Sequence, residues 1–458
     1  MTDKRIINIL IVICILFMSL IGYLTYLELF EAEELAKSPY NQRQWAYEED
    51  IERGMILDKE GVILAQSKDG ERTYPYDNMY SHIIGYNSRI YGKSLLESKY
   101  NQLLLGQYGL GGLNITGNKK KGYNLYLTID HNLQKVAYNS IGNRNGSAVA
   151  INPKTGEILA MVSKPDFNPN TLSEQWESLV DNENSPLLPR ATSGLYAPGS
   201  TFKILTSSAA LDLNLQDMVF EDKGSIEIGG KTVSNSGSKA YGNITFDRAF
   251  QLSSNVAFCS LGVTAGFDKL KSTAENFGFN KEPDYDFPVA KSIFPLSAKE
   301  DAEIAALAMG QGNTLATPLQ MALVACAVAN DGVIMEPRLV SHATNNSGVT
   351  ILATKPKQQS VAMSKENADY ITDMMVKTVT QGTGTSAMIN GITVAGKTGT
   401  AENEQTVMQK NKEHTWFVAF APAEDPEIAV AVMLEYSGGS GASVCGPIVR
   451  NIIREYLR

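Results

Sequence analysis

The chain has 458 residues, of which 43% are hydrophobic and 19% are charged, and its formal net charge at pH 7 is −9. This length and composition are typical of a globular protein with two or three packed units, and they exclude a disordered chain. The acidic balance, without a long block of Lys or Arg, argues against nucleic acid as the main partner.

The N-terminal residues MTDKR precede an uncharged apolar run from Ile6 to Leu27. A helix of this length spans about 33 Å at about 1.5 Å per residue, which is enough to cross a bilayer. A cleaved signal peptide is the alternative, but its apolar core is shorter and ends in a small-residue cleavage site. We therefore predict a retained membrane anchor at 6–28, with the basic residues 1–5 in the cytoplasm and the rest of the chain outside.

The segment 29–122 is rich in Tyr, Asn, Gly and charged residues and contains short strand-like pieces. One of these, RGMILDKEGVILA at 53–65, predicts a hairpin with DKEG at its turn. The polar, glycine-rich stretch GGLNITGNKKKGYN marks a boundary. We expect a small strand-containing module at 29–122 and a second unit at 123–458.

In the second unit, strand-like and helical patterns alternate. Asp130 is placed to cap a helix over LQKVAYNSI, and SAVAINPKTGEILAMVS predicts two strands joined by a Pro-Gly turn. The segment HTWFVAFAPAEDPEIAVAVMLEY repeats that design, and GPIVRNIIREYLR predicts an amphipathic C-terminal helix. These elements predict an α+β domain in which helices pack against an antiparallel sheet.

Cysteine and histidine patterns point to no metal site. Three cysteines lie outside the anchor, without CxxC spacing, and we interpret them as buried apolar residues: Cys259, Cys326 and Cys445. The four histidines include no pair at metal-ligand spacing, so we expect neither a metal nor another cofactor.

A serine-lysine pair in PGSTFK is the first candidate for chemistry. Ser200 follows a Pro-Gly break at a predicted helix start, where its backbone N–H is free to bind an oxyanion. Lys203 lies three residues on, on the same helical face, where its amine can reach the hydroxyl. The pair alone is a weak signal, because Ser236 and Lys239 repeat the spacing in a Gly- and Ser-rich loop that we expect to be solvent-exposed.

Two further motifs follow in the chain. Ser253-Ser254-Asn255 interrupts an apolar helical stretch, and KTGT at 397–400 follows the strand-like run ITVAG. A second KTG, at 154–156, is predicted to form a hairpin turn in which the Lys154 side chain is exposed to solvent. Without its neighbours, the Ser-Ser-Asn triplet would read as a helix cap. Ser-x-x-Lys, Ser-x-Asn and Lys-Thr-Gly in this order are typical of penicillin-binding proteins and serine β-lactamases.

With these motifs the sequence resembles the class B, monofunctional penicillin-binding proteins, which are peptidoglycan D,D-transpeptidases. The resemblance covers nearly the whole chain and includes RGMILDKEGVILA, HIIGY, YGKSLLE, RATSGLYAPGSTFK, GQGNTLATPLQMA and VAGKTGTAE. In the first of these, Lys59 replaces the arginine that is usual in the family. The short module is most similar to the smaller PbpA-type members. The implied fold is the penicillin-binding/serine β-lactamase-like transpeptidase domain.

The resemblance implies a catalytic role for each motif. Ser200 would attack the penultimate D-alanine of a stem peptide and form an acyl-enzyme that a neighbouring stem resolves by its amine. Lys203 would be the base, and Ser253 would relay a proton to the leaving amine. Asn255 would hold the substrate amide and the base.

The strand motif is implied to bind the end of the peptide. Lys397, Thr398, Gly399 and Thr400 resemble the group that binds the terminal carboxylate, and we expect open space above the Lys397 amine at the end of its strand. Burial and that second cation would together lower the pKa of the base Lys203, so that its amine can be neutral. The oxyanion hole would be formed by the N–H groups of the nucleophile and Thr400.

Other functions stay open from the sequence. A membrane-anchored β-lactamase or β-lactam sensor would share the three motifs, and a non-catalytic scaffold would use the module to bind a membrane partner. The module and the Ser-x-Asn pattern favour the transpeptidase. The resemblance further implies stem peptides and β-lactams as ligands, inhibition by β-lactams, and a polytopic glycosyltransferase of the SEDS type as partner, with no nucleic acid.

Overall fold

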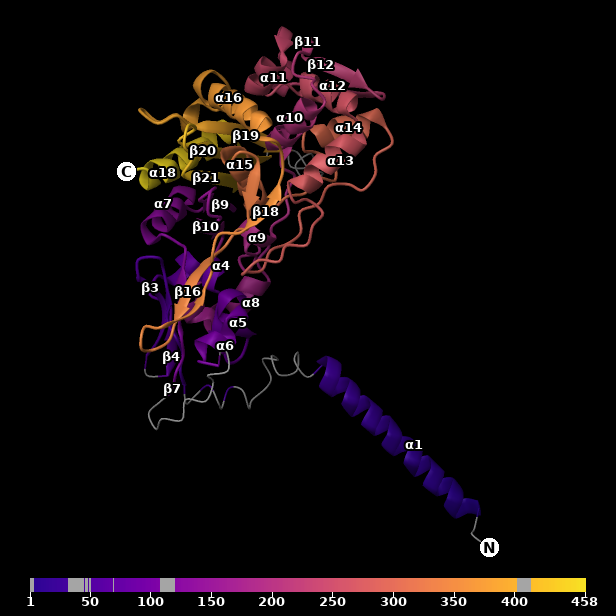
Figure 1. The fold of residues 1–458 in the computed structure, drawn as a ribbon, viewed down its shortest axis with the longest axis vertical. Helices are drawn as coiled ribbons and strands as arrows, with labels where there is room; N and C mark the ends of the chain where they lie inside the picture. The colour runs from indigo at the N-terminus through magenta and orange to yellow at the C-terminus, as the bar shows by residue number, and fades with distance from the viewer. Residues whose placement is uncertain are drawn as a thin grey trace.

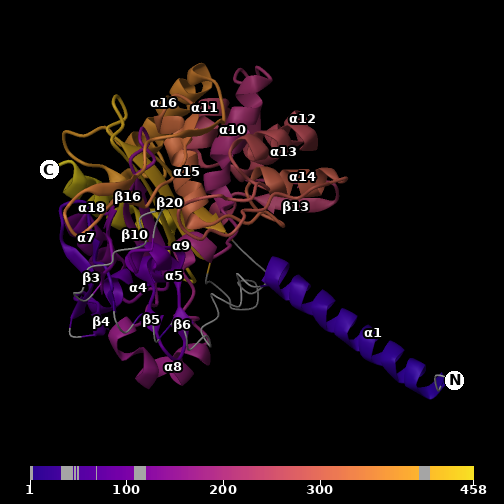
Figure 2. The same ribbon diagram turned by 60° about the horizontal axis from the view of Figure 1, so that its bottom comes forward.

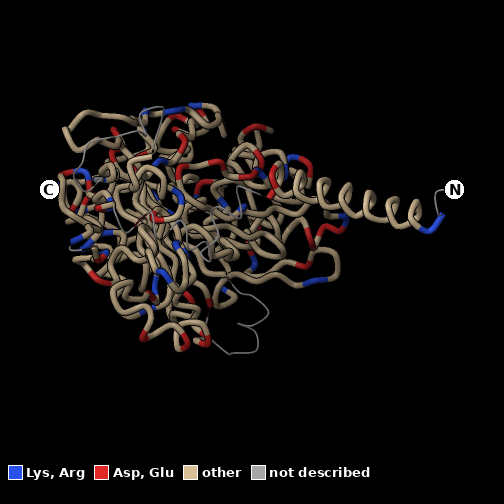
Figure 3. Tube along the Cα trace, turned by 90° about the horizontal axis from the view of Figure 1, so that it is seen from below, with Lys and Arg blue, Asp and Glu red and all other residues tan. Residues whose placement is uncertain are grey.

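The computed structural model describes residues 4–31, 45, 48, 51–68, 70–107, 120–401 and 413–458. Helix α1 (Lys4–Tyr26) begins the described chain and continues into a π-helical turn at Leu27–Glu31. None of its residues is buried, and by length and composition it can cross a membrane. Figure 3 shows it without charge beyond its basic N-terminal end. The chain therefore has one N-terminal apolar helix suited to single-pass membrane anchoring.

A five-stranded antiparallel sheet forms the centre of the C-terminal unit, in the order β10-β9-β21-β20-β19. Its strands are β9 (Gly146–Ile151), β10 (Ile158–Lys164), β19 (Ala395–Ala401), β20 (His414–Ala421) and β21 (Ile428–Leu434). All residues of β9, β10, β20 and β21 are buried. The continuous apolar runs in the sequence thus reflect strands that are covered on both faces. Strand β19, which carries KTGT, lies at the edge of this sheet.

Helices cover the two faces of this sheet. One face packs against α7 (His131–Ile141) and α18 (Gly446–Tyr456), and the other against α10 (Lys203–Asp212), α15 (Pro318–Ala329) and much of α16 (Lys365–Gln381). The predicted cap of α7 is confirmed, because the Asp130 carboxylate accepts the Leu133 N–H at 3.0 Å. The predicted hairpins β9–β10 and β20–β21 and the C-terminal helix are also confirmed.

The N-terminal part is built around a six-stranded sheet in the order β17-β16-β8-β2-β3-β4. Its strands are β2 (Ile56–Leu57), β3 (Ile63–Lys68), β4 (Glu71–Thr73), β8 (Asn124–Leu127), β16 (Val340–Thr344) and β17 (Thr350–Ala353). The predicted hairpin at 53–65 is the β2–β3 pair. Two strands, β16 and β17, therefore come from more than 200 residues further along the chain, and Figure 1 shows β16 reaching down into the N-terminal part, where it pairs with β8.

A buried ion-pair network stabilises this part. The Glu97 carboxylate receives Arg53 Nε and Arg72 Nε at 2.7 Å each. Burial alone would raise the pKa of Glu97, but the two guanidinium groups bring that pKa below its usual value. Short elements complete the N-terminal part: β1 (Ile51–Glu52), α4 (Ser81–Ile84), β5 (Asn87–Ser88), β6 (Gly92–Lys93), α5 (Leu95–Lys99), α6 (Asn101–Leu104) and β7 (Lys120–Lys121).

The remaining elements lie mostly between α10 and α15 in the chain. They are α8 (Leu172–Val180), α9 (Arg190–Ser193), β11 (Val219–Asp222), β12 (Ser225–Ile228), β13 (Lys231–Ser234), β14 (Gly242–Thr245), α11 (Phe246–Leu252), α12 (Asn255–Ala265), α13 (Phe267–Asn276), α14 (Asp301–Ala308), β15 (Val333–Met335) and β18 (Gln358–Val361). Figures 1 and 2 both show α11, α12 and α14 at the end of the molecule opposite β3 and β4. The α+β fold class is thus confirmed.

Candidate active site

The nucleophile candidate lies on a short 3₁₀ turn (Gly199–Phe202) that leads into α10. Gly199 has φ +53°, and a Cβ there would lie 2.4 Å from the Thr400 carbonyl oxygen, so only glycine lets the turn approach β19. The Gly199 N–H donates to the Gly310 carbonyl at 2.9 Å. This hydrogen bond attaches the turn to the segment GQGN at 310–313. Ser200 is half-buried and lines a cleft.

Lys203 is completely buried beside this cleft. Its amine donates to the Ser253 carbonyl and to Asn255 Oδ1, both at 2.8 Å, and lies 3.3 Å from Ser253 Oγ. Burial lowers the pKa of Lys203 to about 7. Because a neutral amine has two N–H groups and one lone pair, the two short bonds use both N–H groups, and the lone pair remains to accept a hydroxyl proton.

The Ser-Ser-Asn triplet forms a sharp break between α11 and α12, as predicted. Ser253 adopts a left-handed conformation, with φ +55°. The cap of α12 is Ser254, whose Oγ accepts the Ala257 N–H at 3.0 Å. The capping interpretation therefore applies to the middle residue, and it leaves the side chains of Ser253 and Asn255 to bind the lysine.

The position of Lys397 differs from the prediction. It is the third residue of β19 and not the end of a strand, because pairing with β20 continues from Ala395 to Ala401. The expected open space above its amine is also wrong, since the residue is completely buried. The amine donates to Ser253 Oγ at 2.8 Å and to the Thr398 carbonyl at 3.1 Å. Burial, together with Lys203, lowers the pKa of Lys397 well below its usual value.

All eight predicted residues come together at one cleft of about 1230 Å³. Six of them line it: Ser200, Ser253, Asn255, Thr398, Gly399 and Thr400. The two lysines are buried behind this lining, and both bond to Ser253. Ser253 Oγ therefore lies between two amines, an arrangement that can pass a proton from one to the other.

Several lining residues carried no signal in the sequence. Thr383 follows α16 and shares a 2.7 Å hydrogen bond between its Oγ1 and Thr398 Oγ1. Strand β13 with the turn after it, at 231–237, and the segment 439–442 also line the cleft. Neither segment carries a motif, so only the tertiary fold reveals that they face the nucleophile.

The second copies of the motifs are placed differently. Lys154 lies at the hairpin tip, exposed, in an ion pair with Asp425. Lys239 is exposed, and the turn before it contains Gly237 with φ +63°, so no helical face aligns it with Ser236. Ser236 itself lines the cleft. Neither copy places a buried amine beside a hydroxyl.

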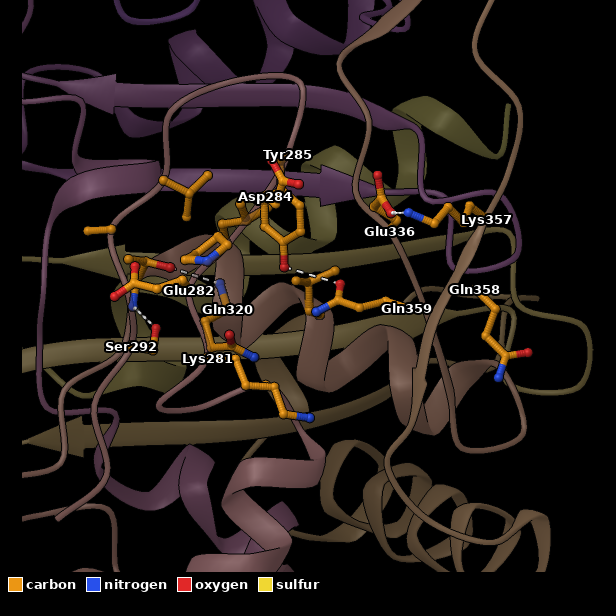
Figure 4. A pocket seen from close by; sticks show the side chains of 17 residues that line it. Lys281, Glu282, Asp284, Tyr285, Ser292, Gln320, Glu336, Lys357, Gln358 and Gln359 are labelled. Atoms are coloured by element: carbon orange, nitrogen blue, oxygen red, sulfur yellow. Dashed lines mark hydrogen bonds and ion pairs between the residues drawn. The ribbon is translucent and has the colours of Figure 1, made fainter. Parts of the chain in front are cut away.

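Another cavity, of about 270 Å³, lies away from these residues (Figure 4). It is lined by polar side chains that pair with one another, among them Tyr285, whose hydroxyl donates to Gln359 at 3.1 Å. Lys357 and Glu336 form an ion pair at its rim. None of the predicted site residues lies there.

Comparison with protein families gives two matches. The penicillin binding protein transpeptidase domain matches residues 146–454, and the penicillin binding protein A dimerisation domain matches residues 53–124. The peptidoglycan D,D-transpeptidase PbpA of Mycolicibacterium smegmatis is 36% identical over 98% of this chain and 98% of the relative. The protein of the same name from Mycobacterium tuberculosis is 34% identical over 95% of each chain.

Solved structures give the same result. The ceftriaxone acyl-enzyme complex of penicillin-binding protein A from M. tuberculosis has a TM-score of 0.85 and 32% identity, covering 90% of this chain and 99% of that one. A D,D-transpeptidase domain from Eggerthella lenta has a TM-score of 0.81 and 39% identity, covering 89% and 98% of the two chains. Together, the order of the three motifs, their meeting at one cleft and these similarities place the chain in the penicillin-binding protein family of transpeptidases.

Proposed function

We propose that this peptidoglycan D,D-transpeptidase cross-links stem peptides through an ester on Ser200. Ser200 Oγ attacks the carbonyl of the penultimate D-alanine and transfers its proton to the Lys203 amine. The bond to the terminal D-alanine breaks, and that residue leaves as an amine after taking up a proton. The amine of a neighbouring stem then attacks the ester, forms the new amide and returns Ser200 to its hydroxyl form.

The observation that carries this proposal is the geometry of the Lys203 amine. Ser253 and Asn255 accept both of its N–H groups, so the remaining lone pair is oriented by two fixed bonds. With the pKa near 7, much of the amine is neutral at physiological pH and can act as a base. No histidine is needed for this nucleophile-and-base pair.

Ser253 is the proton relay in this proposal. Its hydroxyl accepts the Lys397 N–H and lies 3.3 Å from the Lys203 amine, so its own proton can turn toward the cleft. A proton taken by Lys203 can thus reach the leaving amine through Ser253. Asn255 holds both Lys203 and the substrate amide.

In this proposal the residues of β19 bind the terminal carboxylate of the stem peptide. Thr398 and Thr400 line the cleft and offer hydroxyl groups to the terminal carboxylate, and the Lys397 amine lies buried behind them. Gly399 lets β19 pack closely against the turn that carries Ser200, since a Cβ there would lie 2.9 Å from the Thr201 methyl group. The N–H groups of Ser200 and Thr400 form the oxyanion hole, because the turn and the strand approach each other at Gly199.

Inhibition by β-lactams follows from the same chemistry. Penicillin-binding protein A of M. tuberculosis forms acyl-enzyme complexes with ceftriaxone, imipenem and penicillin G. A β-lactam carbonyl placed like the D-alanine carbonyl would acylate Ser200, and the resulting ester would persist where water cannot reach it.

The decisive experiment supplies the full-length protein in detergent with a donor stem peptide ending in D-Ala-D-Ala and an acceptor stem peptide. We expect release of D-alanine together with a cross-linked product, both absent from Ser200→Ala. With a fluorescent penicillin the label should be stable. Rapid turnover of the label without cross-linking would favour the β-lactamase, and no labelling of the wild type would exclude both functions.

Acylation should depend on pH through Lys203. Because only the neutral amine accepts the Ser200 proton, the acylation rate should rise as the pH passes through about 7 and level off above it. Below this value the rate should fall about tenfold per pH unit. Stopped-flow labelling by fluorescent penicillin between pH 5 and 9 measures the profile. A profile that is flat, or that rises only near the usual lysine pKa, would contradict a burial-tuned base.

We also propose the division of the chain into a cytoplasmic tail (1–5), an anchor (6–28), a module (29–122) and the transpeptidase unit (123–458). The basic residues Lys4 and Arg5 at the start of α1 support a cytoplasmic N-terminus with the catalytic unit outside. The exposed apolar side chains of α1 can pack against another membrane protein as well as against lipid. This supports a SEDS-type glycosyltransferase as partner, which co-purification with and without α1 would test.

A further inference from the structure

We propose that Asp222, a buried carboxylate on β11, is a positioning residue that holds Asn255 and, through it, the Lys203 amine. Asp222 is 1% exposed and belongs to none of the three motifs. The inference rests on the proposed roles of Lys203 and Asn255.

The carboxylate is held by hydrogen-bond donors and by no salt bridge among the described residues. Oδ1 accepts the Gly224 N–H at 2.9 Å and Asn235 Nδ2 at 2.8 Å. Oδ2 accepts Asn235 Nδ2 at 2.9 Å and the Ser254 hydroxyl at 2.6 Å. Burying a carboxylate without a neighbouring cation costs free energy, and these donors offset that cost. A neutral apolar side chain at this position would need no such donors.

The hydrogen bonds that start at Asp222 continue through Asn235 and Ser254 to the first turn of α12. Asn235 Oδ1 accepts the N–H groups of Asn255 at 2.8 Å and Val256 at 3.2 Å, while Ser254 Oγ accepts that of Ala257. The first three N–H groups of the helix, which have no intrahelical acceptor, are therefore all taken by residues that Asp222 holds. The positive end of the helix also faces the carboxylate.

Asn255 completes the path to the base. Its backbone is fixed by Asn235, its Nδ2 donates to the Ser234 carbonyl at 2.9 Å, and its Oδ1 receives the Lys203 amine at 2.8 Å. A shift of Asn255 would move or free one of the two acceptors that orient the amine. Asp222 thus acts on the reaction without touching the substrate.

An amide cannot replace this carboxylate. With its nitrogen at the Oδ1 position, Asn at 222 would face two N–H donors. With its nitrogen at the Oδ2 position, it would face the Asn235 amide nitrogen, and the Ser254 hydroxyl would have to accept a hydrogen bond where it now donates one. Either orientation sets donor against donor and loosens the start of α12.

The test measures acylation of the full-length protein by fluorescent penicillin as a function of pH. For Asp222→Asn we expect the rate to fall on the order of 10- to 100-fold, the effect of a small misplacement of a catalytic group. The acid limb of the profile should also move to higher pH, because water then reaches the Lys203 amine. Lys397 on β19 and Cys259 on α12 are the other ionisable groups near that amine, and neither is changed.

Asp286→Asn is the matched control. Asp286 is also a carboxylate that accepts backbone N–H groups, from Leu339 and Val340, at the six-stranded sheet. Its variant should lose thermal stability but keep the wild-type pH profile. An equal loss of rate in both variants, or a wild-type rate and profile in Asp222→Asn, would overturn the proposal.

If Asp222→Asn does not fold, Ser254→Ala decides, since it removes one of the donors to Asp222. We expect a smaller fall in rate with the same shift of the acid limb, and a wild-type profile would again overturn the proposal. Labelling that persists in Ser200→Ala would instead show that the proposed nucleophile is wrong, so the two failures are distinguishable.

Discussion

Replacing Lys203 by Ala should lower the rate of acylation by fluorescent penicillin by about 10²–10⁴-fold, the range typical for loss of a general base. The substitution leaves Ser200 without a nearby lone pair to take its proton, and it leaves the Ser253 carbonyl and Asn255 Oδ1 without their donor. Ser200→Ala should lose labelling completely, because the ester cannot form. Both are measured by gel fluorescence after timed exposure, with thermal melting to check the fold.

Two companion variants make this result specific. Lys203→Arg keeps a positive charge but cannot be neutral, so it should be as inactive as Lys203→Ala if the residue is a base. Lys239→Ala changes the lysine of the other Ser-x-x-Lys copy, which is exposed, and should label like the wild type. Substantial labelling of Lys203→Arg would show that the residue acts as a cation and not as a base.

Local signals predicted the elements that carry the site. The Pro-Gly break before Ser200, the polar interruption at 253–255 and the apolar strands of the central sheet all act over a few residues, and the structure has them where the sequence placed them. Such features follow from backbone preference and periodicity, which neighbouring residues decide.

The burial of Lys397 and the pairing of segments distant in the chain could not be predicted from the sequence. The small residues around Lys397 predicted an open amine, but the strand continues and α11 and the Ser253 turn cover it. The joining of β16 to β8, or of Asp222 to Ser254, depends on contacts between distant segments that no local pattern specifies. The burial that lowers the pKa of Lys203 was predicted, whereas Lys397 was predictable as a residue of the site and not as a second buried amine.

Replacing Lys397 by Ala should lower acylation by roughly 10²–10³-fold, the range for loss of one electrostatic stabiliser. The buried amine is the donor to Ser253 Oγ, so its loss removes a hydrogen-bond donor behind the carboxylate site and frees the relay hydroxyl to turn away.

Lys154→Ala is the matched control, because it changes the same residue in the other Lys-Thr-Gly copy. Lys154 is exposed and paired only with Asp425 at the hairpin tip, and such surface pairs contribute little. We expect Lys154→Ala to acylate at the wild-type rate and to melt within a few degrees of the wild type. Equal effects of the two substitutions would show that KTG at 397–399 is not the carboxylate-binding copy. A normal acylation rate with an acid limb moved to higher pH in Lys397→Ala would restrict this lysine to tuning Lys203.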